Sequence, residues 1–412
     1  MDLDQTTSQT KETSVNKMIR TLAVASAATI LAAGAAHSQQ VLKVGISAPM
    51  SGAAANWGLG MEYAAKQAAK AINDAGGVQV EGKKYNFEVV AYDNKYNAAD
   101  GAKVAQNLIN RDKVRYIVGG IGTAPILALQ SLSERNGVML FQSGWGKSLK
   151  GPKLPLTFGQ SNSPYEIYKP LYAHIKKQNP NLKTVAMLNP NDATGKESEP
   201  VAVKAWEELG VKVVSVNWYE RGTTQFQPVA AKLASFKPDM VDLGVTPPAD
   251  AGVVLKEMSV LGWSGVQVVP VATNAEQMVQ IGGKAVENVY MGFAGDYEGS
   301  LATPAQRELN KGMKATLGEG LNPLQVSSYD SLLALKAGME KANSLDPKAI
   351  AAALPQVIFD SSYGKTAFGG AQTYDAPLQM LVPVMITQIK DGKLVEISRA
   401  IPEELTKRLA AK

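Results

Sequence analysis

A glycine-rich turn separates a β-branched run from an alanine- and leucine-rich stretch at Val114–Leu129, VRYIVGGIGTAPILAL. Residues 114–118 have the composition of a buried strand. The glycines within residues 119–122 allow a sharp turn and close approach to a bound molecule, and Thr123 and Pro125 suit the first turn of a helix. Free N–H groups at the positive end of such a helix favour an anion, most simply the carboxylate of a small molecule. The alternative is an ordinary βα turn without a ligand.

The motifs of common enzyme chemistry do not occur in this sequence. It has no G-x-S-x-G elbow, no H-E-x-x-H pair and no cysteine. The segment FQSGWGKS at residues 141–148 approaches the phosphate loop GxxxxGK[ST], but Phe141 replaces its first glycine and residues 149–152 do not suit the required helix. We therefore expect a binding protein with no catalytic residue, cofactor or metal.

Composition places the chain among ordinary globular proteins. Its 412 residues are 45% hydrophobic and 19% charged, which is enough for a sizeable core and more than one lobe. The net charge of +5 comes from scattered lysines rather than basic blocks. We therefore expect no nucleic-acid partner.

The N-terminus has the pattern of an export signal. Lys17 and Arg20 precede an apolar run from Leu22 to Ala36, and small residues follow before Gln39. Residues 1–38 are therefore predicted to be a secretory signal peptide, and the mature chain is expected in the periplasm. Residues 1–17 are unusually polar for such a signal, so we expect translation to start at Met18.

After this signal, apolar strands alternate with amphipathic helices. Strands are predicted at 41–48, 85–92, 114–118 and 138–142, with helices at 60–75, 99–110 and from 123. This order favours right-handed crossovers and a mostly parallel sheet. A ligand would then bind beyond the carboxyl ends of the strands.

A second series of the same kind begins after residue 160. Helices are predicted at 165–177, 199–209, 226–236 and 249–261, and strands at 184–189, 211–219, 240–245 and 266–271. Helices at 304–317 and 324–342 and strands at 380–389 and 394–397 follow. The sequence thus predicts an α/β fold of two Rossmann-like lobes, with the chain crossing between them more than once. We expect residues 39–160 and 290–372 in the first lobe and residues 161–289 and 373–412 in the second.

Four ordered segments give the mature chain a resemblance to the periplasmic leucine/isoleucine/valine-binding protein family. They are VLKVGISAPMSGAAANWGLGMEYAAKQAAKAINDAGGV, EVVAYDNKYNAADGAKVAQNLI, VRYIVGGIGTAP and PVMITQIKDGKLV. The resemblance implies two lobes with parallel sheets, joined by three crossovers, that close on a small molecule. It also implies an ABC permease in the inner membrane as partner, and we expect the protein to be a monomer.

The resemblance further implies a pocket built from loops that follow strands. Trp57 matches the aromatic residue that covers the ligand, and Thr123 matches a hydroxyl that binds its carboxylate. Further contacts to the carboxylate and ammonium would come from backbone and hydroxyl groups of Ser143, Gly144 and Trp145. The second lobe would contribute Thr194, Thr246 and Ala272.

One departure from the family pattern concerns the ammonium of an amino acid. Amino-acid-binding members carry a carboxylate in the loop after the last strand of the second lobe, but here residues 270–274 read PVATN. A buried ammonium without a counter-charge costs several kcal/mol, so Asp192, Asp296 or a water network would have to replace the missing group. We therefore expect a ligand with a carboxylate and an apolar or aromatic body but no α-ammonium, held between Trp57 and Trp145.

Two other functions share parts of this pattern. A sensor protein for a small amide or acid that feeds a signalling system would have the same sequence features throughout. An exported enzyme on this fold would need an acid and a base paired in the cleft, and Asp93 in the segment YDN reads first as a turn-capping residue.

Overall fold

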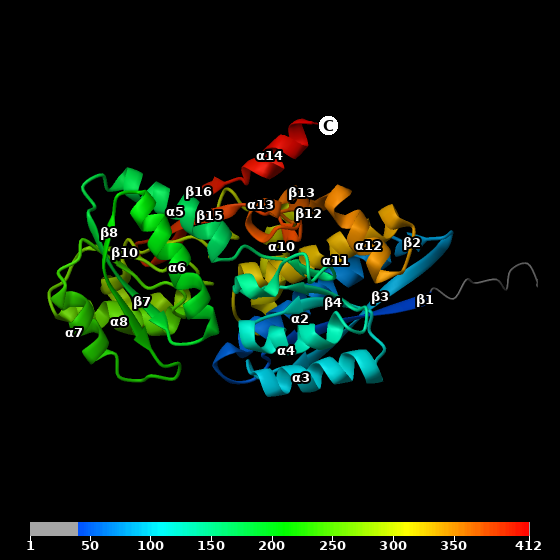
Figure 1. The fold of residues 1–412 in the computed structure, drawn as a ribbon, viewed down its shortest axis with the longest axis horizontal. Helices are drawn as coiled ribbons and strands as arrows, with labels where there is room; N and C mark the ends of the chain where they lie inside the picture. The colour runs from blue at the N-terminus through cyan, green and yellow to red at the C-terminus, as the bar shows by residue number, and fades with distance from the viewer. Residues whose placement is uncertain (1–39, 412) are drawn as a thin grey trace, which may run out of the picture. The chain divides into compact units, whose positions relative to one another are not determined.

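Two separate β-sheets form the framework of the described residues, 40–411, in the computed structural model (Figure 1). The predicted signal peptide and the proposed start at Met18 lie outside the described residues. None of the described helices is both long and apolar enough to cross a membrane. We call each sheet with the helices packed on it a lobe.

The first sheet has nine strands in the order β12-β13-β14-β6-β5-β4-β1-β3-β2. Its central pairs are parallel: β1 with β4, β4 with β5, β5 with β6, and β6 with β14. Antiparallel pairs extend the sheet at both edges, through β12 and β13 at one edge and β2 at the other. The strands are β1 (Gln40–Ala48), β2 (Val78–Val80), β3 (Lys83–Asp93), β4 (Tyr116–Gly120), β5 (Met139–Gln142), β6 (Thr157–Gly159), β12 (Ile358–Ser361), β13 (Gly364–Gly369) and β14 (Gln379–Met380).

The second sheet has seven strands in the order β16-β15-β11-β10-β9-β7-β8. The pairs from β8 to β11 are parallel, and β15 and β16 add an antiparallel hairpin at one edge. The strands are β7 (Thr184–Pro190), β8 (Lys212–Tyr219), β9 (Met240–Asp242), β10 (Val266–Val268), β11 (Tyr290–Met291), β15 (Val384–Lys390) and β16 (Lys393–Ala400).

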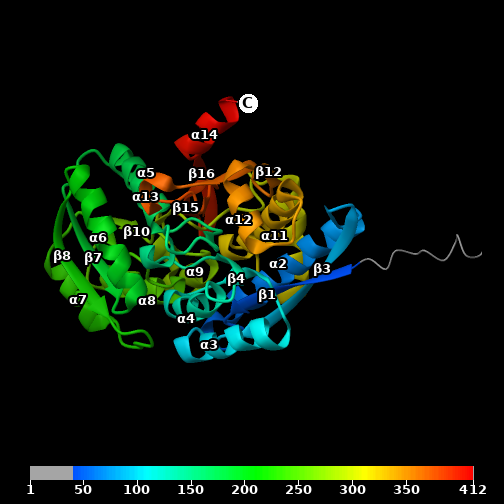
Figure 2. The ribbon, with the colours of Figure 1, turned by 45° about the vertical axis from the view of Figure 1, so that its right-hand side comes forward.

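Helices cover both faces of the two sheets, as the two views of the ribbon show (Figures 1 and 2). In the first lobe, α2 packs on α11 and α3 packs on α4; in the second, α5 packs on α6, and α8 lies between α7 and α9. The α-helices are α2 (Ala55–Asp74), α3 (Ala98–Gln106), α4 (Thr123–Ser133), α5 (Pro164–Gln178), α6 (Ala193–Glu208), α7 (Gln227–Ser235), α8 (Pro248–Val260), α9 (Glu276–Gly282), α10 (Pro304–Leu317), α11 (Pro323–Ala342), α12 (Pro347–Ala353), α13 (Ala371–Tyr374) and α14 (Glu403–Ala410).

Alternate residues of the central strands belong to different hydrophobic clusters. In β7, Val185 and Met187 pack in one cluster and Ala186 and Leu188 in another. Successive side chains of a strand point to opposite faces, so both faces of the sheet are buried. Parallel sheets in α/β proteins have this arrangement, and it explains why these strands read as continuous apolar runs in the sequence.

The chain passes three times between the sheets, which confirms the expected crossovers. It leaves the first sheet after β6, returns to it after β11, and leaves it again after β14. β11 still pairs in the second sheet and β14 in the first, in contrast to the expected boundaries at residues 290 and 372. We therefore propose lobe boundaries after residues 291 and 380.

Two helices begin earlier than their apolar periodicity predicts. α2 begins at Ala55 rather than at residue 60, and α6 begins at Ala193 rather than at 199. Glycines in the first turn of α2 weaken its helical signal, but they fit close contacts: a Cβ on Gly58 would lie 2.0 Å from the carbonyl oxygen of Pro49. Short elements such as β2, β12, β14 and α13 were missed because they span too few residues to show a period.

Candidate ligand-binding site

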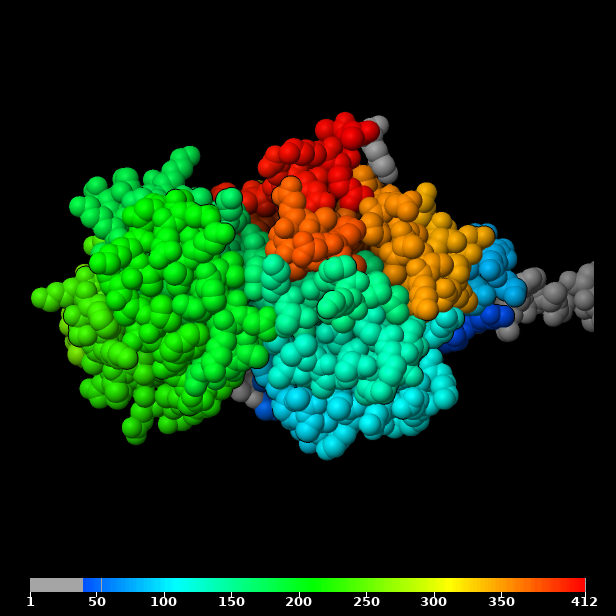
Figure 3. Space-filling model, viewed as in Figure 1, coloured from blue at the N-terminus to red at the C-terminus, as the bar shows by residue number. Residues whose placement is uncertain are grey.

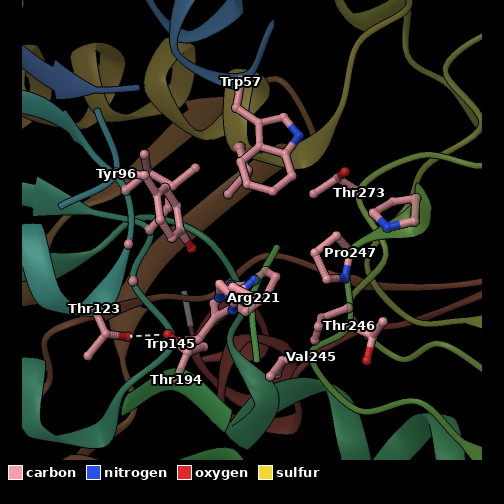
Figure 4. Close-up of a pocket in the computed structure, with 17 residues that line it drawn as sticks. Trp57, Tyr96, Thr123, Trp145, Thr194, Arg221, Val245, Thr246, Pro247 and Thr273 are labelled. Carbon is pink, nitrogen blue, oxygen red and sulfur yellow. Dashed lines mark hydrogen bonds between the residues drawn. The ribbon is translucent and has the colours of Figure 1, made fainter. Parts of the chain in front are cut away.

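A pocket lies where loops of the two lobes (Figure 3) face each other, and Figure 4 shows the residues that line it. Most of its residues follow the carboxyl ends of strands, as expected for this class of fold. The first lobe contributes Trp57, Tyr96, Ile121, Gly122, Thr123, Ser143, Gly144, Trp145 and Leu324, and the second contributes Thr194, Arg221, Val245, Thr246, Pro247, Pro248, Val271 and Thr273.

Two aromatic rings form one wall of the pocket. The centroids of Trp57 and Tyr96 lie 6.2 Å apart with their planes tilted by 60°, and the Tyr96 hydroxyl points into the pocket (Figure 4). Trp57 lies in the first turn of α2 rather than in the loop that the sequence suggested. The Asp93 carboxylate connects the loop before Trp57 to the loop before Tyr96. It accepts hydrogen bonds from the Met50 and Lys95 amides at 2.9 and 2.8 Å.

The glycine turn after β4 forms as expected. Gly122 has a φ of +85° and caps α4 without a side-chain hydrogen bond, and Thr123 begins the helix. In α4 the Ile126 amide is the first to bond within the helix, to the Gly122 carbonyl at 3.1 Å. The Thr123 amide has no hydrogen-bond partner among residues 40–411, so it remains a donor at the positive end of a helix.

The amides after β5 are not available in the expected way. The Ser143 amide donates to the carbonyl of Gly120 at 2.7 Å, and the Gly144 amide donates to the side-chain oxygen of Gln142 at 2.5 Å. Both residues line the pocket, but their N–H groups are used within the protein. The Ser143 and Gly144 amides are therefore not free to bind a carboxylate, whereas the indole N–H of Trp145, which is buried without a partner among the described residues, is a free donor of this loop.

A cation that the sequence analysis missed lies in the pocket. The Arg221 side chain is 31% exposed, and its Nε donates to the Asp192 carboxylate. Within the described residues its two terminal nitrogens have no hydrogen-bond partner. Burial acts to lower the pKa of Arg221, but the Tyr96 hydroxyl and the Asp192 carboxylate outweigh it and hold the pKa above its usual value. The guanidinium therefore stays charged and keeps donors free for an anion.

The second lobe adds small hydroxyl groups and apolar contacts. Thr246 and Thr273 are 1% and 2% exposed, and the hydroxyl of Thr273 has no partner among the described residues. Buried hydroxyls normally find partners, so a ligand that reaches the Thr273 hydroxyl would satisfy it. Ala272 does not line the pocket, because its side chain packs in the hydrophobic cluster of the second lobe; its neighbours Val271 and Thr273 do.

No carboxylate lines this pocket. Asp192 caps α6 by accepting from the Gly195 amide at 2.9 Å and is paired with Arg221. Asp296 accepts from the Gly299 amide at 2.8 Å and lines a different opening. The two carboxylates that could have replaced the missing counter-charge of an ammonium are thus engaged elsewhere.

Several contacts join the lobes across the pocket rim. The Thr123 and Thr194 hydroxyls lie 3.0 Å apart (Figure 4). Ser148 donates to the Glu197 carboxylate from its amide at 3.0 Å and from its hydroxyl at 2.8 Å, and the Arg221 guanidinium lies 5.9 Å from the centroid of the Tyr96 ring. These contacts hold the loops of the two lobes together beside the pocket.

The pocket residues that the family resemblance did not indicate also follow the carboxyl ends of strands. Tyr96 and Arg221 lie just after the carboxyl ends of β3 and β8, as Thr123 and Ser143 do for β4 and β5. Neither Tyr96 nor Arg221 belongs to a glycine-rich turn, so the sequence pattern around them does not indicate a ligand site. Applying the strand-end rule to every strand would have included them.

Fold and pocket together define a class of protein: a two-lobed α/β protein that binds a small molecule between its lobes. The chain belongs to the periplasmic binding protein family, whose model matches residues 41–393, and within it to the leucine/isoleucine/valine-binding type. Proteins of this type are substrate-binding proteins of ABC importers.

The relatives differ in the ligands that their names give. A leucine-, isoleucine-, valine-, threonine- and alanine-binding protein from Pseudomonas aeruginosa is 25% identical over 351 residues, covering 83% of this chain and 90% of the relative. A leucine-binding protein from Thermotoga maritima has a TM-score of 0.75 at 19% identity, covering 88% and 100%. A solute-binding protein from R. palustris in complex with benzoate has a TM-score of 0.72 at 18% identity, covering 88% and 97%.

Proposed function

We propose that this protein binds a small organic acid with an apolar or aromatic body and no α-ammonium, and delivers it from the periplasm to an ABC permease. The ligand-binding residues would be Trp57, Thr123, Ser143, Gly144, Trp145, Thr194 and Thr246, as expected from the sequence, together with Tyr96, Arg221 and Thr273. The observation that carries the proposal is a pocket that contains a cation with free donors and no carboxylate.

Charge balance is the physical reason for this choice. An acid would pair its carboxylate with Arg221 and with the free donors of Thr123 and Trp145, and charge-assisted hydrogen bonds of this kind are the strong ones. The ammonium of an amino acid would instead lie in a largely desolvated pocket beside a guanidinium, with no free carboxylate near it. The rings of Trp57 and Tyr96 supply a flat apolar wall for the body of the ligand.

Closure follows from the division of these groups between the lobes. Trp57, Tyr96 and Trp145 belong to the first lobe and Arg221 and Thr273 to the second, so only the closed form offers a ligand both the apolar wall and the cation. A ligand that contacts both lobes binds the closed form more tightly and shifts the equilibrium towards it.

Calorimetric titration with benzoate, 4-methylpentanoate and leucine tests the proposal. We expect the acids to bind and leucine to bind weakly or not at all. Arg221→Gln should weaken acid binding by about 10- to 100-fold, since a hydrogen bond to a charged group contributes about 1.5–3 kcal/mol. Arg135→Gln, which changes an exposed arginine of the first lobe, serves as the control. Tight leucine binding without a response to the acids would overturn the proposal.

A further inference from the structure

A buried serine lies behind the pocket and bonds to one of its lining residues. Ser327 on α11 is 4% exposed and does not line the pocket. Its Oγ lies 3.1 Å from Oγ of Ser143, which does. It also donates to the Leu324 carbonyl at 2.7 Å and accepts from Nε2 of Gln160 at 3.0 Å. Ser327 therefore has three hydrogen-bond partners.

The single proton of the Ser327 hydroxyl decides the direction of its bond to Ser143. A hydroxyl has one proton to donate and two lone pairs to accept with. The Leu324 carbonyl can only accept, so it receives the proton of Ser327. The amide nitrogen of Gln160 can only donate, so it occupies one lone pair. The remaining lone pair faces Ser143, which must be the donor in that bond.

The Gln160 side chain lies against the same group of serines on α11. Its Oε1 lies 3.0 Å from the Ser331 hydroxyl, which also faces the Ser327 carbonyl at 2.7 Å, and its Nε2 lies towards Ser327 and Ser328. Gln160 is fully buried, so its side chain bonds to protein groups rather than to solvent. The chain of bonds runs from Gln160, at the first crossover, through Ser327 to Ser143.

We propose that Ser143 meets the ligand as a hydrogen-bond acceptor only, that Ser327 is the positioning residue that holds it in this role, and that the ligand is therefore an acid with a neutral hydroxyl group. The hydroxyl proton of Ser143 goes to Ser327 and its amide proton to Gly120. Ser143 thus has no donor left for a carboxylate, whereas its free lone pairs suit a donor on the ligand.

A hydroxyl satisfies this acceptor better than an ammonium does. Both groups can donate, but an ammonium brings a charge into a pocket that contains Arg221 and no carboxylate. A neutral hydroxyl brings no charge. This inference rests on the proposed function, since it adds a hydroxyl to the acid already inferred, and it narrows the ligand class to hydroxy acids.

Three molecules of matched shape test which group Ser143 accepts from. At the same carbon, 2-hydroxy-4-methylpentanoate carries a hydroxyl, 4-methylpentanoate a hydrogen and leucine an ammonium. The three hydroxybenzoates and the fluorobenzoates of the same substitution form a matched aromatic set, because fluorine cannot donate. Calorimetric titration of the full mature protein should show that, in at least one set, the hydroxyl compound binds about tenfold more tightly than its partners, as expected for one net hydrogen bond.

The role of Ser327 is tested by the ratio of affinities. Ser327→Ala frees the proton of Ser143 to rotate towards the pocket, so the preference for the hydroxyl compound should shrink several-fold while the acid without a donor binds as well or better. Ser235→Ala removes a similar local hydroxyl bond, from Ser235 to the Lys232 carbonyl, on exposed α7 and should leave the ratio unchanged. If Ser327→Ala does not fold, Ser143→Ala, which removes the acceptor itself, should abolish the preference.

Other results would contradict the hydroxyl preference, the binding of acids, or both. Binding of the acids without preference for a hydroxyl, or a preference that survives both Ser327→Ala and Ser143→Ala, would refute the inference and leave the proposed function standing. Strongest binding of leucine would refute both. Failure of every acid to bind would refute the proposed function and, with it, the inference.

Discussion

The hydroxyl oxygen of Thr123, at the start of α4 in the first lobe, lies 3.0 Å from that of Thr194, at the start of α6 in the second. Both side chains are at most 5% exposed and both line the pocket. The hydrogen bond between them joins two helix N-termini across the interface of the lobes. Separation of the lobes would break this bond, so under the proposed closure it links the position of the lobes to the ligand site.

Thr194→Val removes this bond while it preserves the shape of the side chain. A net hydrogen bond contributes about 0.5–1.5 kcal/mol, so ligand affinity should fall by about 2- to 10-fold. X-ray scattering should show a smaller closed fraction at the same ligand concentration. Thr316→Val, which changes an exposed threonine bonded only to the Gly312 carbonyl within α10, should change neither measurement.

Glu197→Gln weakens the second contact between the lobes. The carboxylate of Glu197 receives two hydrogen bonds from Ser148, and a glutamine has only one acceptor oxygen. Because Glu197 does not line the pocket, we expect a loss of affinity of a few-fold for every ligand alike, without a change in selectivity. Glu208→Gln, at the exposed end of the same helix, is the control. A change in selectivity would contradict this assignment.

Lys150 should make stability rise with pH above about 8. Its Nζ is buried, donates to Gln379 at 2.7 Å and lies 3.9 Å from the centroid of the Tyr374 ring. Burial lowers the pKa of Lys150 to about 8, against the influence of Glu166. The unfolded chain then binds more protons between about pH 8 and 10.5, so folding stability increases across this window, by about 3 kcal/mol at most. Lys150→Met should remove the rise in urea unfolding experiments, whereas the exposed Lys153→Met should retain it.

Asp330 should have the opposite effect in a lower pH range. It is fully buried on α11, and its carboxyl group accepts from the amide and hydroxyl of Ser362 at 2.6 and 2.8 Å. Burial raises the pKa of Asp330 to about 7. The folded chain therefore holds a proton that the unfolded chain loses, so the contribution of Asp330 to stability is complete below about pH 4 and is lost as pH rises towards 7.

Asp330→Asn should flatten this part of the stability profile, because an amide has no proton to release between pH 4 and 7. Urea unfolding at several pH values measures the slope. Asp360→Asn, on an exposed residue of β12, is the matched control. An unchanged slope in Asp330→Asn would show that another group titrates here.

The sequence alone determined the fold class and much of the pocket because both depend on local patterns. Buried parallel strands leave continuous apolar runs, and amphipathic helices leave a 3.6-residue period, so the alternation of the two series could be read directly. The resemblance to the leucine/isoleucine/valine-binding family then selected Thr123, Ser143, Trp145 and Thr246. These residues lie beyond the carboxyl ends of strands, and all four line the pocket.

Only the tertiary structure decided which donors, acceptors and charges of the pocket residues are free to bind a ligand. Arg221 and Tyr96 come together from different lobes, Asp192 is paired with Arg221, and the amides of Ser143 and Gly144 are used by Gly120 and Gln142. Each fact depends on which group reaches another across the fold, and no local period records it. Residue types fix which hydrogen bonds are possible, whereas distance and direction between remote segments fix which of them form.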